Sequence, residues 1–335
     1  MRLAGKRLFV CGMIAGVFCI STRSGRGDPV TPGDVIASVS PLYRGNIVGT
    51  KYIAEYSSIG RVQILTNVPQ PGGTGATTDY ARDLIMGTDN ALYLYNGTFN
   101  PYLARLDLGT LGWTQQTFAG WSTLNILGHG GIARLGAYYY VTDMETFNPG
   151  GSPSGIIRFD TSGGPTVRFA LGLQPNDLYI GSDGVLYALA GNTITKYNPL
   201  TFASLGSLSI TGNYVKAIAV VADGSIFVAN LDGHVNHFSN TGILLNSLTI
   251  PGAQLSDIDI DSTGRIVLGT INSGIIAMTD TSFVTYTTIP VGDNATGGEV
   301  YVAWVTIPEP SSMALLATAV AALVCLKRPY RNPKE

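Results

Sequence analysis

Hydrophobic and polar residues alternate along most of the chain, and Gly, Asn or Asp interrupts the alternation every few residues. Five segments share one form, which is a short apolar run, a tight turn and a second apolar run. In two of them the turn is an Asp-Gly pair, at 183–184 and 223–224, which signals a β-hairpin because glycine supplies the positive φ of the turn. No segment of the body has a sustained helical period. The pattern predicts an all-β domain.

The five turns recur at separations of 46, 48, 40 and 40 residues. Two further strands are expected after most hairpins, as at 193–198 and 204–210. A repeat of this length with four short strands is typical of a β-propeller blade. The residues that anchor the turns are Asn90, Gly136, Gly184, Gly224 and Gly264.

The two ends of the body are expected to close the ring. Three strands without an inner partner are predicted at 46–49, 51–56 and 61–65. One strand without a blade is predicted at 299–304. Pairing them completes a sixth four-stranded blade and removes two exposed sheet edges, which promote aggregation. Seven blades is the alternative, because 70–80 is unassigned. The inner-strand pattern, Asp-Ile followed by Asp-Gly, is similar to NHL-type and related six-bladed propellers, and this resemblance concerns the fold.

The first 27 residues have the organisation of a secretory signal peptide. Three basic residues precede an uncharged apolar run at 8–20. Its 13 residues are short for a hydrocarbon core of about 30 Å, but they suit the core of a signal peptide. Cleavage is expected between 21 and 27. Lipidation of Cys19 is the alternative, and the bulky Phe18 before it argues against a lipoprotein signal.

The last 29 residues, 307–335, consist of a polar turn, an apolar run and a basic end. Two prolines fix φ in the turn and prevent a helix from continuing through it. The apolar run, 313–326, reaches about 21 Å as a helix, which is short for a permanent span. The positive-inside rule would hold the basic end in the cytoplasm. The turn contains Pro308, Glu309, Pro310 and Ser311, and the basic end contains Lys327, Arg328 and Arg331.

This order of Pro-Glu-Pro, short apolar helix and basic cluster resembles the PEP-CTERM sorting signal. The resemblance implies that an exosortase-type transpeptidase recognises 308–311 while the helix is transiently in the membrane. It also implies that the helix is removed and that the protein is then released or attached at the envelope. An ordinary single-pass anchor is the alternative. We therefore expect a signal peptide at 1–27, a propeller at 28–306 and a sorting tail at 307–335.

The charge of the body argues against one class of partner, and the positions of the cysteines exclude two kinds of structural site. The net charge is −2, but nine of the 20 Lys and Arg lie in the terminal segments, so the body is acidic. An acidic body does not suit nucleic-acid binding, which needs a basic face. The three cysteines, Cys11, Cys19 and Cys325, lie outside the body, so it has no disulfide framework or thiolate metal site.

Asp83, Asp177 and Asp257 recur at the starts of predicted blades and could ring a central channel. Together with His129, which lies in a glycine-rich segment, they would be the acids and bases of a lactonase- or lyase-like site. In the other interpretation the carboxylates cap backbone N–H groups between blades. The recurrence of one position in three blades favours this structural role, so no catalytic residue is predicted.

Asp257, Asp259 and Asp261, followed by Gly264, superficially resemble a calcium loop. Isoleucines alternate with these acids, which puts the acids on one face of a strand. An EF-hand loop instead needs a compact turn with a glycine at its sixth position and a glutamate at its twelfth. The hairpin interpretation is favoured, and bound Ca²⁺ is the alternative. No other cofactor is expected.

The histidines and aromatic residues give weaker indications of function. His234 and His237 are three positions apart, so on a strand their rings point to opposite faces and do not form a metal site. The aromatic residues could form a sugar-stacking surface, but strand alternation favours the core for them. They are Tyr138, Tyr139, Tyr140, Trp113, Trp121 and Trp304.

From these observations we expect an exported, non-enzymatic propeller that acts as a binding module at the cell surface, in the outer envelope or in the extracellular matrix. Its expected partners are surface polysaccharide or protein. The alternative is an exported hydrolase or lyase of the six-bladed type.

Overall fold

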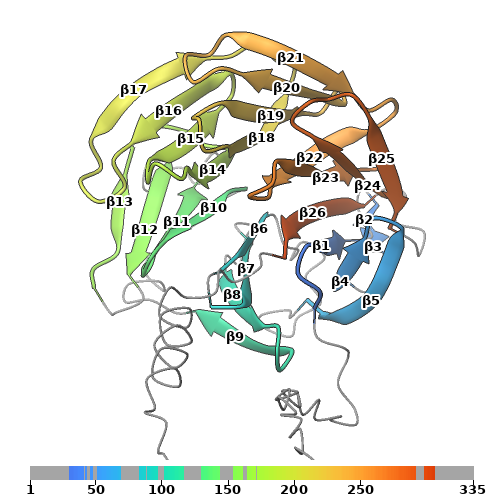
Figure 1. Ribbon diagram of the computed structural model, residues 1–335. Helices are drawn as coiled ribbons and strands as arrows, with labels where there is room; N and C mark the ends of the chain where they lie inside the picture. Colours follow the sequence, from blue (N-terminus) through green and yellow to red (C-terminus); the bar gives the residue numbers. More distant parts are fainter. Residues whose placement is uncertain are drawn as a thin grey trace, which may run out of the picture.

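In the computed structural model, six inner strands surround a central axis, and the other strands of each blade follow them outward to an exposed rim (Figure 1). The inner strands lie side by side around this axis, because each repeat starts with a brief apolar run that the two neighbouring repeats bury. The structure describes residues 30–40, 42–43, 46–47, 51–68, 83–87, 89–96, 102–116, 130–143, 154–160, 164–170, 172–291 and 298–305.

Within these residues the strands form six four-stranded antiparallel blades. From the inner to the outer strand, blade 1 consists of β6 (Asp83–Met86), β7 (Ala91–Asn96), β8 (Tyr102–Asp107) and β9 (Gly112–Gln116). Blade 2 consists of β10 (Ile132–Leu135), β11 (Tyr138–Asp143), β12 (Gly155–Asp160) and β13 (Val167–Phe169). Blade 3 consists of β14 (Asp177–Ile180), β15 (Leu186–Ala190), β16 (Thr193–Tyr197) and β17 (Ser204–Ser209). Blades 4 to 6 are β18 (Val215–Val220), β19 (Ile226–Asn230), β20 (His234–Phe238) and β21 (Leu244–Thr249); β22 (Gln254–Ile260), β23 (Arg265–Ile271), β24 (Ile275–Asp280) and β25 (Tyr286–Pro290); and β26 (Glu299–Trp304), β1 (Val35–Ser40), β4 (Tyr52–Ser57) and β5 (Gly60–Asn67).

The six inner strands form a closed ring. Going round it, each of β6, β10, β14, β18, β22 and β26 contacts the next, and β26 contacts β6. A seventh inner strand has no place between them, so the six-bladed prediction is confirmed and the seven-bladed alternative is wrong. The unassigned segment 70–80 lies outside the described residues.

Blade 6 combines the two ends of the body, as the sequence predicted. Its inner strand β26 pairs with β1 from Val35↔Trp304 to Ser40↔Glu299. One of the expected N-terminal strands was wrong, because β1 takes the place given to 46–49. All six residues of β1 are buried, and such a strand lacks the alternation by which the others were found.

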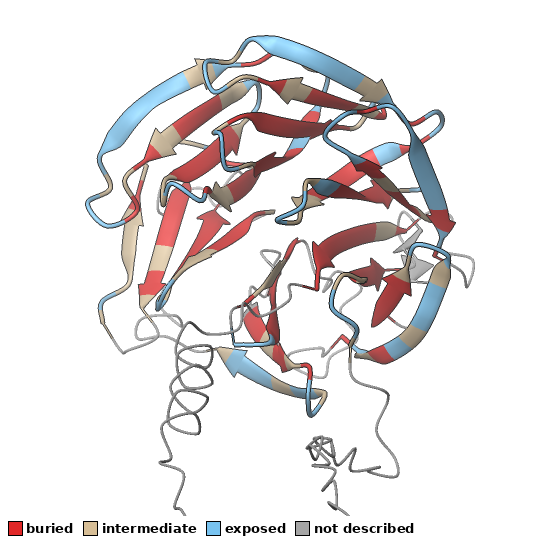
Figure 2. Cartoon of the chain, viewed as in Figure 1, coloured by how far each residue is buried: buried red, intermediate tan, exposed pale blue. Residues whose placement is uncertain are grey.

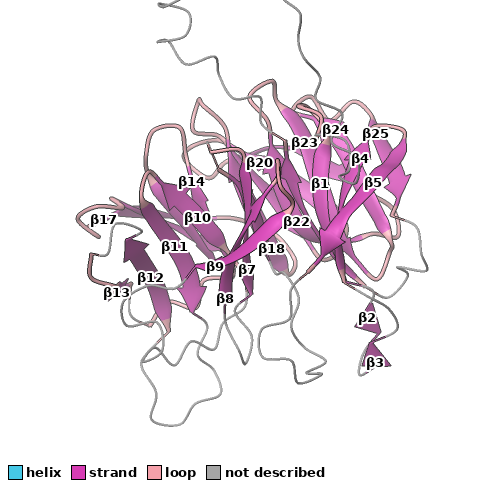
Figure 3. Cartoon of the chain, turned by 90° about the horizontal axis from the view of Figure 1, so that it is seen from below, coloured by secondary structure: helices cyan, strands magenta, loops and turns pink. Residues whose placement is uncertain are grey.

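The Asn46–Ile47 segment instead forms β3, which pairs with β2 (Leu42–Tyr43) in a small hairpin. This hairpin projects from one face of the disc when the molecule is seen from the side (Figure 3). Its two short strands belong to no blade.

The core is divided into six apolar clusters in the described part of the chain, one at each contact between neighbouring blades. The second strands of the blades are almost wholly buried, for example β19, and the outer strands β17 and β21 are mostly exposed (Figure 2). Tyrosines also join the blades through polar ends, since Tyr95 Oη donates to Thr142 O at 2.9 Å and Tyr140 Oη donates to Pro199 O at 3.1 Å. Because each cluster belongs to two blades, no blade has a core of its own.

The predicted turn residues all have positive φ, from 55° at Asn90 to 85° at Gly264. Gly184 lies at 73°, and a Cβ added there would meet no atom within 4 Å. Its substitution therefore tests backbone conformation without steric conflict.

We expect Gly184→Ala to lower the free energy of unfolding by about 1 kcal/mol, because an L side chain disfavours the left-handed region. Gly184→Asn should cost less, since Asn90 occupies the equivalent turn of blade 1 at φ 55°. Urea unfolding of both variants measures the difference. Equal costs for alanine and asparagine would contradict this explanation.

Among the described residues there is no helix long and apolar enough to cross a membrane. The predicted signal peptide and sorting tail lie outside those residues, so their boundaries at 27 and 307 stay predictions.

Candidate functional site

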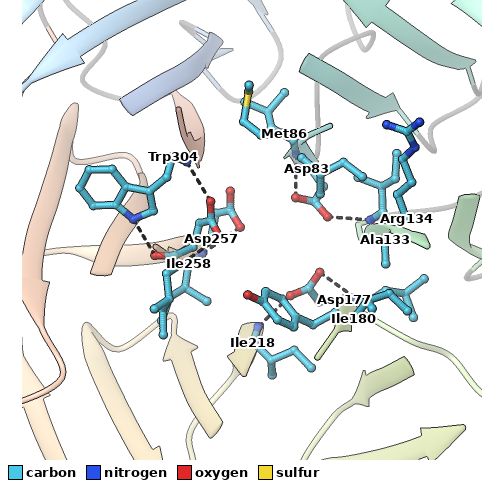
Figure 4. A pocket seen from close by; sticks show the side chains of 17 residues that line it. Asp83, Met86, Ala133, Arg134, Asp177, Ile180, Ile218, Asp257, Ile258 and Trp304 are labelled. Carbon is cyan, nitrogen blue, oxygen red and sulfur yellow. Dashed lines mark hydrogen bonds between the residues drawn. The ribbon is translucent and has the colours of Figure 1, made fainter. Parts of the chain in front are cut away.

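Three aspartates lie on the inner strands of alternate blades and face the central channel (Figure 4). Asp83 opens β6, Asp177 opens β14 and Asp257 lies within β22. All three are buried. The fold thus brings together three of the four residues that the sequence marked as channel candidates. The fourth, His129, lies outside the described residues.

Each of these aspartates links its own blade to the next through backbone N–H groups. Its Oδ1 accepts a hydrogen bond from the following amide, and its Oδ2 accepts one from the inner strand of the next blade. For Asp177 the donors are Leu178 N and Ile218 N, both at 2.7 Å. The equivalent donors are Leu84 N (2.7 Å) and Ile132 N (2.6 Å) for Asp83, and Ile258 N (2.8 Å) and Val302 N (2.7 Å) for Asp257. The carboxylates therefore cap backbone amides between blades, in the role that their recurrence favours.

Asp259 makes a second link of this kind between blades 5 and 6. It accepts hydrogen bonds from Ile260 N and Trp304 N, both at 2.8 Å. Sequence reasoning placed it on the same strand face as Asp257 but missed its contact with β26. One sequence signal could have indicated this contact. Asp259 follows Asp257 by two residues, and residues two apart on a strand lie on the same face.

Asp261, the third acid of the apparent calcium loop, belongs to the β22–β23 turn. It accepts hydrogen bonds from Thr263 N at 2.9 Å and from Arg265 Nε at 2.6 Å. The acids of this stretch thus have separate partners, as the hairpin interpretation requires. No group of three His, Cys, Asp or Glu within the described ranges is arranged to hold a metal ion.

The three aspartates also divide the channel into two chambers, since all three line both. One chamber, of about 240 Å³, lies toward the hairpin turns and is lined by the ends of the inner strands, including Met86 and Ile180. We call it the turn-side chamber. The other, of about 190 Å³, lies at the starts of the inner strands, where Lys216 and Ser256 line it. We call it the start-side chamber.

Burial changes the acidity of the channel carboxyls. It raises the pKa of Asp177 to about 7 and that of Asp259 to about 6, against the pull of the backbone N–H groups that they bind. Burial also holds the pKa of Asp83 well above its usual range, and the negative charges of Asp257 and Asp177 add to this effect. The pKa of Asp257 is likewise well above its ordinary value, through burial and the charge of Asp177. The charge of one channel carboxyl therefore raises the pKa of another across the channel.

The histidine pair lies on β20, in the third strand of blade 4. The ring of His237 stacks on Phe227 with centroids 4.1 Å apart, while His234 Nδ1 lies 3.1 Å from Asp232 Oδ1. Burial lowers the pKa of His237. Each ring thus has its own surroundings away from the channel.

The aromatic residues mostly fill contacts between strands and blades. Tyr139, Tyr140 and Trp304 are buried, and Arg265 lies 4.4 Å from the centre of the Trp304 ring. Trp113 is partly buried and its Nε1 donates to Asn67 O at 3.2 Å, which joins blade 1 to blade 6. Trp121 lies outside the described residues.

Solved structures with a similar fold confirm the class of the body, which is a six-bladed β-propeller. A protein of unknown function from Bacteroides caccae matches at 12% identity over 82% of this chain and 98% of that chain, with a TM-score of 0.54. A virginiamycin B lyase from Staphylococcus aureus matches at 14% identity over 76% and 89%, with a TM-score of 0.51. A gluconolactonase from Xanthomonas campestris matches at 16% identity over 65% and 75%, with a TM-score of 0.50. At these identities the likeness shows the fold alone.

Residues 306–328 match the model of the PEP-CTERM protein-sorting motif. The protein is thus an exported β-propeller with a C-terminal PEP-CTERM sorting signal, and the predicted resemblance is confirmed. The motif residues Pro308, Glu309, Pro310 and Ser311 and the basic Lys327 and Arg328 fall within the match. These residues, and Arg331 after them, lie outside the described residues. A comparison with curated proteins found no match.

Proposed function

We propose that the protein is a non-enzymatic binding module that is processed at its sorting tail and then displayed at the cell surface or in the extracellular matrix. The observation that carries the non-enzymatic role is the use of the channel carboxylates. Asp83, Asp177 and Asp257 each use both oxygens to hold backbone amides of two blades. A residue that holds the scaffold in this way is poorly placed to move during a reaction.

Processing follows from the order of segments in the tail. An exosortase-type transpeptidase would recognise 308–311 while the apolar run is in the membrane, and the helix would then be removed. The protein would be released or attached at the envelope, where surface polysaccharide or protein is the partner class that we propose for its loops.

Replacing Pro308, Glu309 and Pro310 with alanine should leave an unprocessed form that stays with the membrane fraction. Immunoblotting of membrane and extracellular fractions measures the ratio of the two forms. A variant with Lys334→Ala, which changes the tail beyond the motif, should be processed as the parent is. Normal processing of the triple variant would contradict the sorting role of the tail.

An exported hydrolase or lyase is the second candidate, and the raised pKa of the channel acids favours it. A carboxyl with a pKa near 7, such as Asp177, has the acidity of a general acid. Virginiamycin B and gluconolactone are suitable first substrates, because similar folds include a virginiamycin B lyase and a gluconolactonase. We expect no turnover of either. Turnover that Asp177→Asn abolishes in a folded protein would favour the enzyme.

A further inference from the structure

A basic residue recurs at one position in the third strand of the blades. In each case it lies opposite an aromatic residue of the second strand. The pairs are Arg105 and Tyr93 in blade 1, Arg158 and Tyr140 in blade 2, Lys196 and Tyr187 in blade 3, and His237 and Phe227 in blade 4. The strand register makes these positions structurally equivalent, so the surroundings of the basic residues can be compared.

The hairpin turn supplies an acid near this position in blades 1, 3 and 4. The acid lies four residues before the aromatic residue and is Asp89, Asp183 or Asp223. In blade 1 it provides a counter-charge to the basic residue, because Asp89 Oδ2 lies 3.1 Å from Arg105 Nε. Blade 2 has Gly136 at the same position. Arg158 therefore lacks the counter-charge that Arg105 has.

Two aromatic rings hold the side chain of Arg158 in place. Its guanidinium carbon lies 4.5 Å from the centre of the Tyr138 ring and 4.6 Å from the centre of the Phe202 ring. The Phe202 ring is fixed in turn, because it stacks on Phe169 with centroids 4.6 Å apart. This arrangement orients the guanidinium, but it leaves the N–H donors of Arg158 without acceptors.

Among the described residues Arg158 has no hydrogen-bond or ion-pair partner, and its Nε is buried without an acceptor. The other charged residue of β12 is Asp160, which forms no ion pair with Arg158. Its carboxylate lies against Gly164, where an added Cβ would collide with Asp160 Oδ2. The hydroxyl of Tyr138 also has no hydrogen bond to a described residue. Buried polar groups are nearly always hydrogen-bonded, so these donors indicate an acceptor from outside the chain.

The unused donors define the chemistry of that acceptor. A guanidinium presents its N–H groups in a planar fork that matches the two oxygens of a carboxylate. One positive charge in an acidic body suits one such group better than a densely charged phosphate polymer. Leu200, in the same turn as Phe202, is 56% exposed, and Tyr138 is half-buried. A ligand that fits therefore combines a carboxylate with a body that has both apolar C–H groups and hydroxyls.

We propose that Arg158, Tyr138 and the turn at 198–202 form a binding site for a hexuronate unit of an acidic polysaccharide. The sugar carboxylate would accept hydrogen bonds from the Nη groups of Arg158, and a ring hydroxyl would pair with Tyr138 Oη. The apolar face of the sugar would lie against Leu200. This assignment rests on the proposed binding role and names a ligand class for it.

Isothermal titration calorimetry of the full chain with tetragalacturonate tests the proposal. Its methyl ester is the uncharged control, and tetraglutamate presents carboxylates without sugar rings. We expect saturable binding of tetragalacturonate and at least tenfold weaker binding of the other two. Arg158→Gln should weaken binding about tenfold or more, and Arg158→Lys several-fold, because an ammonium group lacks the planar fork. Tyr138→Phe deletes one hydroxyl and should weaken binding several-fold.

Gly136→Asp restores the missing turn acid and leaves the binding residues unchanged. Gly136 has a φ of 58°, which aspartate adopts more readily than most L residues, and a Cβ there would meet no atom within 4 Å. The new carboxylate should pair with Arg158 and weaken binding about tenfold. Gly136→Asn adds a similar shape without the charge and should bind nearly as the parent does. Arg105→Gln removes the equivalent arginine of blade 1 and should leave binding unchanged.

The assignment is overturned if the folded parent does not bind tetragalacturonate, or if the methyl ester or tetraglutamate binds equally well. It is also overturned if Gly136→Asp and Arg158→Gln both bind as the parent does, since Arg158 would then have a packing role alone. Normal tail processing with binding of a neutral polysaccharide or a protein would still support the proposed function in each of these cases.

Discussion

Removal of residues 299–335 should abolish cooperative unfolding, whereas removal of 307–335 alone should leave it intact. The first deletion takes away β26, the inner strand of blade 6. That strand pairs with β1 along six residues, and five of its own six residues are buried. Its loss also leaves Asp257 Oδ2 without Val302 N and Asp259 Oδ2 without Trp304 N.

The expected loss exceeds the whole stability of a typical domain, which is about 5–15 kcal/mol. Losing the inner strand opens the ring, exposes the edge of β1 and takes one of two backbone amide partners from each of Asp257 and Asp259. Circular dichroism during heating distinguishes the two deletions. The shorter chain should show no sharp transition, and the chain that lacks only the tail should melt as the parent does. A sharp transition at the parent midpoint in both chains would show that ring closure contributes little.

Raising the pH from 5 to 8 should lower the free energy of unfolding, on the order of 3 kcal/mol from Asp177 alone. Burial raises the pKa of Asp177 to about 7 in the folded protein, compared with an ordinary value of 3.8. The folded state therefore binds more protons than the unfolded state between these two values. The stabilisation from this difference is fully present below the unfolded-state pKa of 3.8. It is lost as the pH rises through the folded-state pKa of about 7. Asp259, with a pKa of about 6, contributes with the same sign.

Urea unfolding at several pH values measures this dependence, and Asp177→Asn is the variant that isolates it. Asparagine is uncharged at every pH, so the variant should have a flatter profile, although its NH2 group cannot replace the oxygen that accepts one of the two backbone amides. Its stability relative to the parent should therefore be lowest at pH 5 and improve toward pH 8. His237 acts in the opposite direction, because its pKa is lowered in the folded protein. Hydrogen bonds from Thr263 and Arg265 outweigh burial and lower the pKa of the turn acid Asp261, so it adds nothing to this dependence. A parent profile that rises from pH 5 to 8 would contradict the role of the buried carboxyls.

Features that recur from blade to blade could be predicted from the sequence, whereas the buried strand β1, which occurs once, could not. Hairpin turns at Gly184 and Gly224 were visible because only a few residue types adopt positive φ. β1 was overlooked because burial on both faces removes the alternation that identifies a strand. The three channel aspartates were found because one position recurs in alternate blades.

The contents of the turn-side chamber were harder to predict. Tyr179 and Arg134 look like ordinary strand residues, and which of them faces the channel depends on the packing of distant blades. Asp259 was predicted on the correct strand face, but its contact with Trp304 joins residues 45 positions apart. Such contacts depend on ring closure, which no local pattern contains.

The position of β26 has a mechanical consequence. This strand directly precedes the sorting tail, so a pull on a propeller attached through that tail would act first on β26. Because β26 is antiparallel to β1 over six residues, a force along its axis loads many hydrogen bonds together rather than one after another. The propeller would thus be tethered by an inner strand, and a force large enough to remove that strand would open the whole ring.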